Sequence, residues 1–248
     1  MGKQAAIKAV ITALVAALLV SCNAMTASDT KGAGKPELGL FTTLPIYWSE
    51  ASDITALLAA DGPRPWVREA IEQNFVIAPL DVFDAEALSH LDRIVLAQPR
   101  PLAPAENVAL DQWVREGGRT LMFADPMLHQ HSIYPIGDKR RPQDVVLISP
   151  ILARWGLGLQ FDESQSEDER LLGNEAAPVP VTMAGELITV DGGFESECTI
   201  TQDRLIARCN IGKGIAVIVA DADLLDSERD SPAARTALDM LLRDAFRQ

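Results

Sequence analysis

Short apolar segments alternate with amphipathic helical segments along most of this chain, and this alternation limits its fold more than any other feature. The expected strands cover residues 38–42, 75–79, 93–97, 120–124 and 158–161, with helical periodicity between them. Such a pattern is typical of an α/β fold, a mostly parallel sheet with helices on both faces. We therefore expect a single α/β domain over residues 37–248.

Local signals place the ends of two helices. One helix is expected to begin near Pro104, a favoured first-turn residue, and to stop at Gly117 and Gly118. The last helix is expected to have Ser231 as its N-cap and Pro232 as its first residue.

An antiparallel insertion is expected around residues 176–212, before a buried strand over residues 215–220. Within it, residues 197–211 predict a hairpin that turns at residues 202–205. A turn centred between residues 203 and 204 places Cys198 directly opposite Cys209, so a cross-strand disulfide is sterically reasonable. The alternative is a pair of reduced structural cysteines.

The first 21 residues predict a cleavable export signal. Lys3 and Lys8 precede an apolar run over residues 9–20, which is too short to span a bilayer. Residues 19–22, Leu-Val-Ser-Cys, resemble the bacterial lipobox, so Cys22 is expected to carry lipid as the first mature residue. The alternative is ordinary cleavage with Cys22 unmodified. Residues 22–36 are expected to form a flexible tether, and Asn23 favours the outer membrane.

The charge of the chain narrows the classes of partner. The formal net charge of −13 becomes −15 once the segment with Lys3 and Lys8 is removed, and such a surface repels nucleic acid. No nucleophile elbow, catalytic triad or phosphate-binding glycine loop occurs in the sequence, and we expect no cofactor.

Three stretches carry a family resemblance: residues 95–104 (Val-Leu-Ala-Gln-Pro-Arg-Pro-Leu-Ala-Pro), 109–119 (Ala-Leu-Asp-Gln-Trp-Val-Arg-Glu-Gly-Gly-Arg) and 123–126 (Phe-Ala-Asp-Pro). They resemble the periplasmic domain of gliding-motility-type ABC transporter auxiliary proteins. A later strand led by Gly212-Lys213-Gly214 and ending in Asp221-Ala222-Asp223 resembles the same family. The resemblance implies a flavodoxin-like fold, similar to class I glutamine amidotransferases but without their catalytic cysteine. The usual auxiliary protein is longer and carries its own transmembrane helices.

Polar residues follow several expected strands, where open α/β sheets bind ligands. They are Asp81, Gln98, Asp125, Asp221 and Asp223. If they converge on one rim, the carboxylates could hold a cation or a cationic group. The alternative is that each one caps a helix or ties down a loop.

Two further groups of residues have weaker claims. His129 and His131 follow Asp125, but His90 is expected at the other end of the sheet, so we expect no metal site. The loop over residues 134–142 holds Asp138, Lys139, Arg140 and Arg141 between turn formers. It is suited to gripping carboxylate or phosphate groups of a partner, or it pairs with the acidic rim of the chain itself.

These observations predict a non-catalytic, lipid-anchored binding domain on the periplasmic face of a bacterial membrane, accessory to an ABC-type transport or envelope system. Its expected partners are the membrane, through lipid on Cys22, and transporter subunits or another envelope protein. Two alternatives stay open: a periplasmic hydrolase that uses Asp125, Asp221 and Asp223, and a free-standing structural envelope lipoprotein.

Lipidation gives the first testable prediction. The mature chain should partition into the detergent phase, because several acyl chains anchor a protein at about 0.8 kcal/mol per buried methylene. A Cys22→Ser variant, expressed alongside the parent, should stay in the aqueous phase. Equal partitioning of the two proteins would show that Cys22 carries no anchor.

Overall fold

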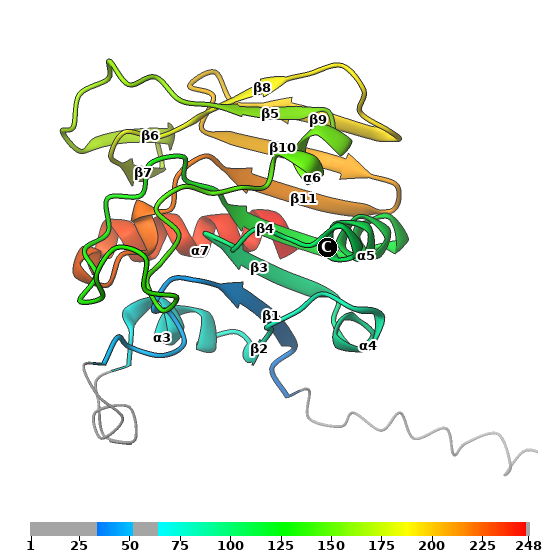
Figure 1. The fold of residues 1–248 in the computed structure, drawn as a ribbon, viewed down its shortest axis with the longest axis horizontal. Coiled ribbons are helices and arrows are strands. Elements are labelled where there is room, and N and C mark those ends of the chain that lie inside the picture. Colours follow the sequence, from blue (N-terminus) through cyan, green and yellow to red (C-terminus); the bar gives the residue numbers. More distant parts are fainter. Residues whose placement is uncertain (1–33, 52–63, 247–248) are drawn as a thin grey trace, which may run out of the picture. The chain divides into compact units, whose positions relative to one another are not determined.

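A central seven-stranded sheet organises the part of the chain that the computed structural model describes, residues 34–51 and 64–246. Its strand order is β2-β1-β3-β4-β11-β10-β9, and the first five strands run parallel (Figure 1). Read along the chain, these five have the order 2-1-3-4-5, which is that of flavodoxin-like folds. The strands are β1 (Glu37–Thr42), β2 (Val76–Pro79), β3 (Arg93–Ala97), β4 (Arg119–Phe123), β9 (Ser196–Ile200), β10 (Ile206–Ile211) and β11 (Gly214–Val219).

Helices cover both faces of the sheet. The connection from β1 to β2 steps toward one edge of the sheet, and the connection from β3 to β4 steps toward the other edge. Because both crossovers are right-handed, their helices lie on opposite faces of the sheet. The C-terminal helix contacts the first of these helices as well as β4 and β11. The helices are α3 (Trp66–Glu72), α4 (Ala85–Leu88), α5 (Pro104–Glu116), α6 (Ser149–Arg154) and α7 (Pro232–Phe246).

The expected helix ends are confirmed. Helix α5 starts at Pro104 and ends at Glu116, and Gly117 follows with φ 130°, a conformation that suits glycine. In α7, the backbone N–H of Ala234 donates to Ser231 Oγ at 3.1 Å, so Ser231 caps the helix as the sequence predicts.

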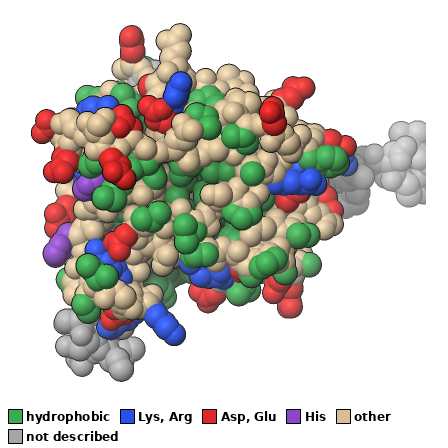
Figure 2. All heavy atoms as spheres, turned by 45° about the horizontal axis from the view of Figure 1, so that its top comes forward, with side chains coloured by type: hydrophobic (Ala, Val, Ile, Leu, Met, Phe, Trp, Pro, Cys, Tyr) green, Lys and Arg blue, Asp and Glu red, His purple; other side chains and the backbone are tan. Residues whose placement is uncertain are grey.

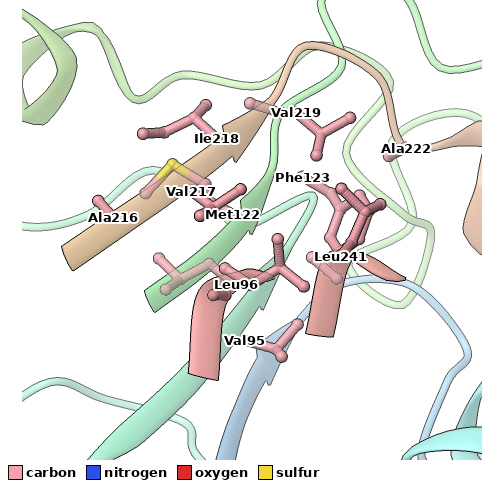
Figure 3. Close-up of a cluster of buried hydrophobic side chains, with 14 of the residues drawn as sticks. Val95, Leu96, Met122, Phe123, Ala216, Val217, Ile218, Val219, Ala222 and Leu241 are labelled. Carbon is pink, nitrogen blue, oxygen red and sulfur yellow. The ribbon is translucent and has the colours of Figure 1, made fainter. Parts of the chain in front are cut away.

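The core is centred on β3, β4 and β11, whose side chains are buried on both faces. Residues 94–97, 121–124 and 216–220 are all at most 2% exposed. In Figure 3, Leu241 of α7 reaches toward Phe123 of β4, with Val95 and Val217 from the neighbouring strands nearby. Because both faces of this parallel sheet are covered, its central strands are continuous apolar runs and do not alternate between apolar and polar residues.

Two small antiparallel sheets lie outside the central one. Strand β5 (Leu157–Gln160) pairs with β8 (Glu186–Thr189), and β6 (Arg170–Asn174) pairs with β7 (Ala177–Val181). The segment 158–161 is therefore a strand, as expected, but the parallel alternation ends at β4. Short α6 leads into β5, which turns to β8 because β11 already occupies the sheet position beside β4. Two short 3-10 helices, η2 (Asp223–Leu225) and η3 (Ser227–Arg229), join β11 to α7.

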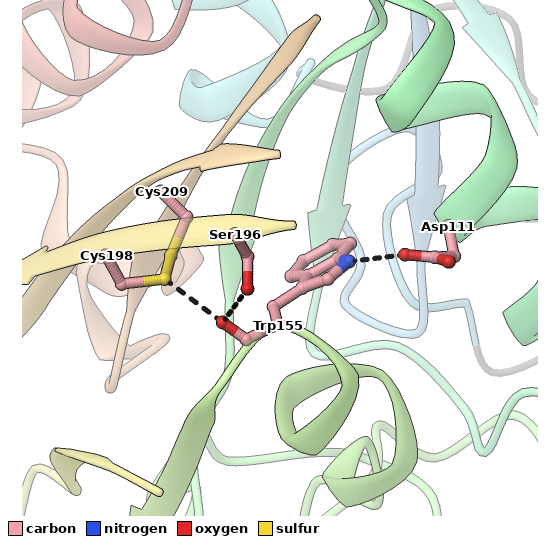
Figure 4. Close-up of a disulfide and its surroundings, with 5 residues drawn as sticks. All are labelled: Asp111, Trp155, Ser196, Cys198 and Cys209. Carbon is pink, nitrogen blue, oxygen red and sulfur yellow. Dashed lines mark hydrogen bonds between the residues drawn. A yellow bond between two sulfur atoms is a disulfide. The ribbon is translucent and has the colours of Figure 1, made fainter. Parts of the chain in front are cut away.

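The expected disulfide is confirmed. Cys198 of β9 and Cys209 of β10 are direct partners in the antiparallel register, with Cα atoms 4.0 Å apart. Cys198 Sγ also lies 3.3 Å from the backbone oxygen of Trp155, which accepts a hydrogen bond from Ser196 Oγ (Figure 4). The indole of Trp155 donates to Asp111 of α5 at 2.9 Å, so the hairpin, α6 and α5 are joined around one buried tryptophan.

The expected export signal, Cys22 and most of the expected tether lie outside the described residues. Within the described part, no helix combines the length and hydropathy needed to cross a bilayer.

Reduction of the disulfide should destabilise the domain. Its cysteines are 11 residues apart, and closing a loop of that size lowers the entropy of the unfolded chain enough to contribute about 2–3 kcal/mol. Urea unfolding should therefore shift to lower midpoint when dithiothreitol is added. The matched control is a Cys198→Ala, Cys209→Ala double variant, which reductant should leave unchanged. An equal response from both proteins would contradict the prediction.

Candidate functional site

Three carboxylates meet beyond the carboxyl ends of β4 and β11, and we call Asp125, Asp221 and Asp223 the acidic cluster. Asp125 and Asp221 are each one residue past a buried alanine that follows its strand, and Asp223 opens η2. All three are at most 1% exposed. The sequence left two readings open, a rim that holds a cation and carboxylates that tie down loops, and the burial of all three side chains favours the second.

Gln98 ties this edge of the sheet together. Its backbone has φ 45°, and its carbonyl accepts from Thr43 Oγ1 at 2.5 Å. Its side-chain amide is fully buried; it accepts from the N–H of Asp125 at 2.9 Å and donates to the carbonyl oxygens of Asp125 and Gln143. Gln98 thus uses its polar atoms to hold the ends of β3 and β4 to the loop that follows β4.

Asp125 and Asp221 are buried together. The Asp125 carboxylate accepts from the N–H groups of Met127 at 2.7 Å and Ala222 at 3.2 Å, which joins the ends of β4 and β11. Asp221 Oδ1 accepts from the N–H of Asp223 at 2.9 Å, while its Oδ2 is buried without a hydrogen-bond partner among the described residues. These bonds match the alternative in which an aspartate after a strand ties down the next loop.

Burial changes the protonation of these acids. Desolvation, with the neighbouring Asp223 charge, raises the pKa of Asp125 to about 7. Desolvation together with the charges of Asp125 and Asp223 raises the pKa of Asp221 well above its ordinary value. The orphan Oδ2 of Asp221 is consistent with a carboxyl group that carries a proton.

A cation of the chain itself contacts the acidic cluster. Arg229 of η3 donates to Asp223 Oδ2 at 3.3 Å, to Thr182 Oγ1 at 2.7 Å and to Glu169 at 2.6 Å. Burial raises the pKa of Asp223, and the charge of Arg229 opposes that rise. Sequence reasoning missed Arg229 and Thr182. No local signal could find them, because Thr182 and Arg229 are 47 residues apart.

The acidic cluster has little access to outside molecules. General acid and base catalysis needs a group within hydrogen-bond reach of a substrate, and these side chains are shielded. His129 and His131 are exposed, and His90 lies before β3 at the amino end of that strand. Within residues 34–51 and 64–246, no group of three or more His, Cys, Asp or Glu side chains is placed to hold a metal ion.

Asp81 lies away from the acidic cluster. It follows β2, the edge strand, which is four strand positions from β11 and so about 19 Å away. Its side chain is exposed, and its carbonyl accepts from Arg100 at 2.6 Å. The expectation that all these residues converge is therefore wrong for Asp81, because β2 pairs outside β1 rather than beside β3.

An ion pair that sequence reasoning missed fixes the neighbouring loops. Arg100 binds Glu106 through two parallel hydrogen bonds of 2.8 and 2.7 Å, and Glu106 also accepts from the N–H groups of Ala103 and Phe83. The bonds from Arg100 lower the pKa of Glu106 to about 2. The sequence did contain a signal for the capping role of Glu106, because this glutamate lies in the first turn of a helix that begins with proline.

The basic loop pairs its charges internally. Arg140 binds both oxygens of Asp138 and stacks on the ring of Tyr134 at 4.2 Å, and the hydrogen bonds from Arg140 lower the pKa of Asp138 to about 2. Arg141 binds Asp144 and the carbonyl of Tyr134. The alternative that the loop pairs with the acidic rim is wrong.

In Figure 2 acidic, basic and histidine side chains gather along the left edge, the end toward which the parallel strands point in Figure 1.

Residues 35–172 match the family described as an ABC-type uncharacterized transport system, which is more than half of the chain. The chain belongs to this family. The match includes the stretches after β3, along α5 and after β4 that carried the resemblance, and it ends before the Gly212–Asp223 segment. Membership indicates an auxiliary component of an ABC-type transport system. No curated protein sequence matches the chain.

The solved structures that are similar to this chain have low sequence identity to it. The mmIFT52 N-terminal domain is 13% identical, with 84% of this chain and 96% of that domain covered, at a TM-score of 0.53. An exo-beta-1,4-mannosidase from Opitutaceae bacterium strain TAV5 is 15% identical at a TM-score of 0.48. The alignment covers 84% of this chain but only 36% of the mannosidase. The cytoplasmic protein STM3548 from Salmonella typhimurium is 11% identical over 87% of this chain and 100% of that one, at a TM-score of 0.47.

The acidic cluster predicts an unusual dependence of stability on pH. The folded pKa values of Asp125 and Asp221 lie above the unfolded value of about 3.9, so the folded chain binds more protons. Their contribution to stability is therefore full below about pH 4 and is lost as pH rises through the folded pKa values, near 7 for Asp125.

Asp221→Asn should remove much of the loss of folding stability that the parent shows as pH rises. The amide oxygen can still accept from Asp223, and the neutral NH2 replaces the orphan oxygen. The variant should gain stability over the parent as pH rises from 5 to 8, because deprotonation of a buried carboxyl group destabilises only the parent. Urea unfolding at four pH values measures this gain. Exposed Glu163→Gln is the matched control, and a similar profile for both variants would contradict the prediction.

Proposed function

We propose that the chain is a lipid-anchored, non-catalytic accessory domain on the periplasmic face of a bacterial membrane, where it binds a protein of an ABC-type transport system. The family match over residues 35–172 carries this proposal. The lipobox-like residues before Cys22 support the anchor and the compartment, and the disulfide fits an oxidising environment. The burial of the acidic cluster against Arg229 supports a binding role over hydrolysis.

The β4–α6 loop, residues 124–148, is the surface best suited to such a partner. It runs without helix or strand between two core elements, and loops of this length in compact domains are usually functional. It also exposes apolar side chains that a folded domain would otherwise bury: Met127, Ile133, Ile136, Val145 and Leu147. Ile136 is 88% exposed, next to the cation-bearing turn of Lys139 and Arg140.

The loop is held in place at both ends and in its middle. Leu128 donates to the carbonyl of Asp144 and Val146 to that of Asp125, which lays the loop's two ends side by side. In the middle, Ser132 Oγ and the N–H of Ile133 donate to Glu50. A preorganised surface loses less entropy when a partner binds.

Site-specific crosslinking in native membranes tests the proposal. A photoreactive side chain at Ile136 should crosslink to a subunit of an ABC-type transporter, and one at Val108, which is 66% exposed on α5, should not. Ile136→Asp should weaken co-purification of that subunit about tenfold or more, because a carboxylate would be desolvated in an apolar contact. Val108→Asp is the control. Thermal unfolding should be unchanged in both variants, since both side chains are exposed.

Two results would contradict the proposal. Equal crosslinking from Ile136 and Val108 would show that the loop is not the contact surface. Crosslinks from Ile136 that never include a transport subunit would favour a free-standing structural envelope protein.

A further inference from the structure

A cavity of about 400 Å³ opens beside the acidic cluster but shares none of its residues. Its walls come from the segment after β1, the start of α3, the β4–α6 loop and η3. Three of these four segments follow the carboxyl ends of the parallel strands β1, β4 and β11. Strand β1 lies where the order of the parallel strands reverses direction across the sheet. Open α/β sheets bind ligands at this position, and the volume is that of a small-molecule site.

One wall carries a buried amide that lacks a partner. Gln130 is 6% exposed and lines the cavity, and its Oε1 is shielded from solvent with no hydrogen-bond partner among the described residues. Buried amides are nearly always hydrogen-bonded, and rotation of the terminal amide can present either its oxygen or its nitrogen to the cavity. A polar ligand group would satisfy it.

The remaining polar residues of the lining include three acids, together with Ser49, Ser227, His131 and Arg64. Glu50 is held in place by bonds from Ser132 and Ile133, and the carboxylate of Glu228 makes no hydrogen bond or ion pair within the described residues. Asp230 lines the cavity too, bound to Arg235 at 2.6 Å. Arg64, the arginine among the described lining residues, has a side chain that is 65% exposed and already bound to Glu72.

Apolar groups complete the lining. Pro45, Ile133 and the indole of Trp66, whose nitrogen donates to the carbonyl of Asp226, also line the cavity. Such a surface suits a short carbon chain. An anion would face Glu50 and Glu228, while Arg64, the charged cation among the described lining residues, already pairs with Glu72, and His131 also lines the cavity.

We propose that this cavity binds a small organic cation, an ammonium group on a short aliphatic chain. The ammonium lies between Glu50 and Glu228, the chain packs on Ile133 and Trp66, and Gln130 supplies a further polar contact. This inference is independent of the proposed transport role, and its failure would leave the crosslinking expectation unchanged.

Three probes of equal chain length test the charge preference: n-butylammonium, butyrate and 1-butanol. Ligand-observed NMR with the full mature chain, carrying Cys22→Ser for solubility, should detect n-butylammonium binding and little or no binding of the other two. Glu228→Gln should weaken n-butylammonium binding about three- to tenfold, as expected for one partly solvated charge pair. Glu163→Gln, an exposed acid away from the cavity, should have no effect.

A second variant tests the pocket itself. Gln130→Met keeps the volume but removes the amide, and it should weaken binding while thermal unfolding stays within a few degrees of the parent. Equal binding of all three probes, absence of binding, or equal effects of Glu228→Gln and Glu163→Gln would each overturn the proposal.

Discussion

Burial of β3, β4 and β11 on both faces is the constraint on which the rest of the structure depends. These strands are apolar at nearly every position, so helices must cover each side of the sheet. The order of the parallel strands and the right-handed connections then set which helix covers which face. The antiparallel hairpin β9–β10 extends the sheet from β11 and carries the disulfide that joins its own two strands.

The same burial determines the character of the acidic cluster. The residues that follow strands ending inside the molecule lie in surroundings of low polarity. Burial of a charged carboxylate there costs folding free energy. Burial therefore raises the pKa of Asp125 and of Asp221. Both carboxyl groups accept hydrogen bonds from backbone N–H groups of neighbouring loops, and Arg229 pairs with Asp223. The acidic cluster at this edge of the sheet is buried by the surrounding chain, and the two surfaces that we propose for other molecules are the β4–α6 loop and the cavity beside Trp66.

Much of the fold could be predicted from sequence because its signals are local. Proline and serine mark helix starts, glycine marks the end of α5, and turn position sets the Cys198–Cys209 register. Prediction of the site was weaker. Gln98, Asp125 and Asp221 were found because a residue just past a strand is visible in the pattern, whereas Arg229 gave no signal. Asp81 was expected near the other carboxylates, because the pattern of strands and helices in the sequence does not say which strand lies at the edge of the sheet.

The sequence by itself determined the class of fold, the ends of its main elements and the cysteine pairing, since each depends on residues within a few positions of one another. Only the tertiary structure decided which polar residues are buried and what they contact. The N–H of Ala222 reaches Asp125 across 97 positions, and Arg229 reaches Thr182 across 47. Such contacts follow from strand order and loop packing, so the charge state of the acidic cluster is a property of the assembled sheet rather than of any one segment.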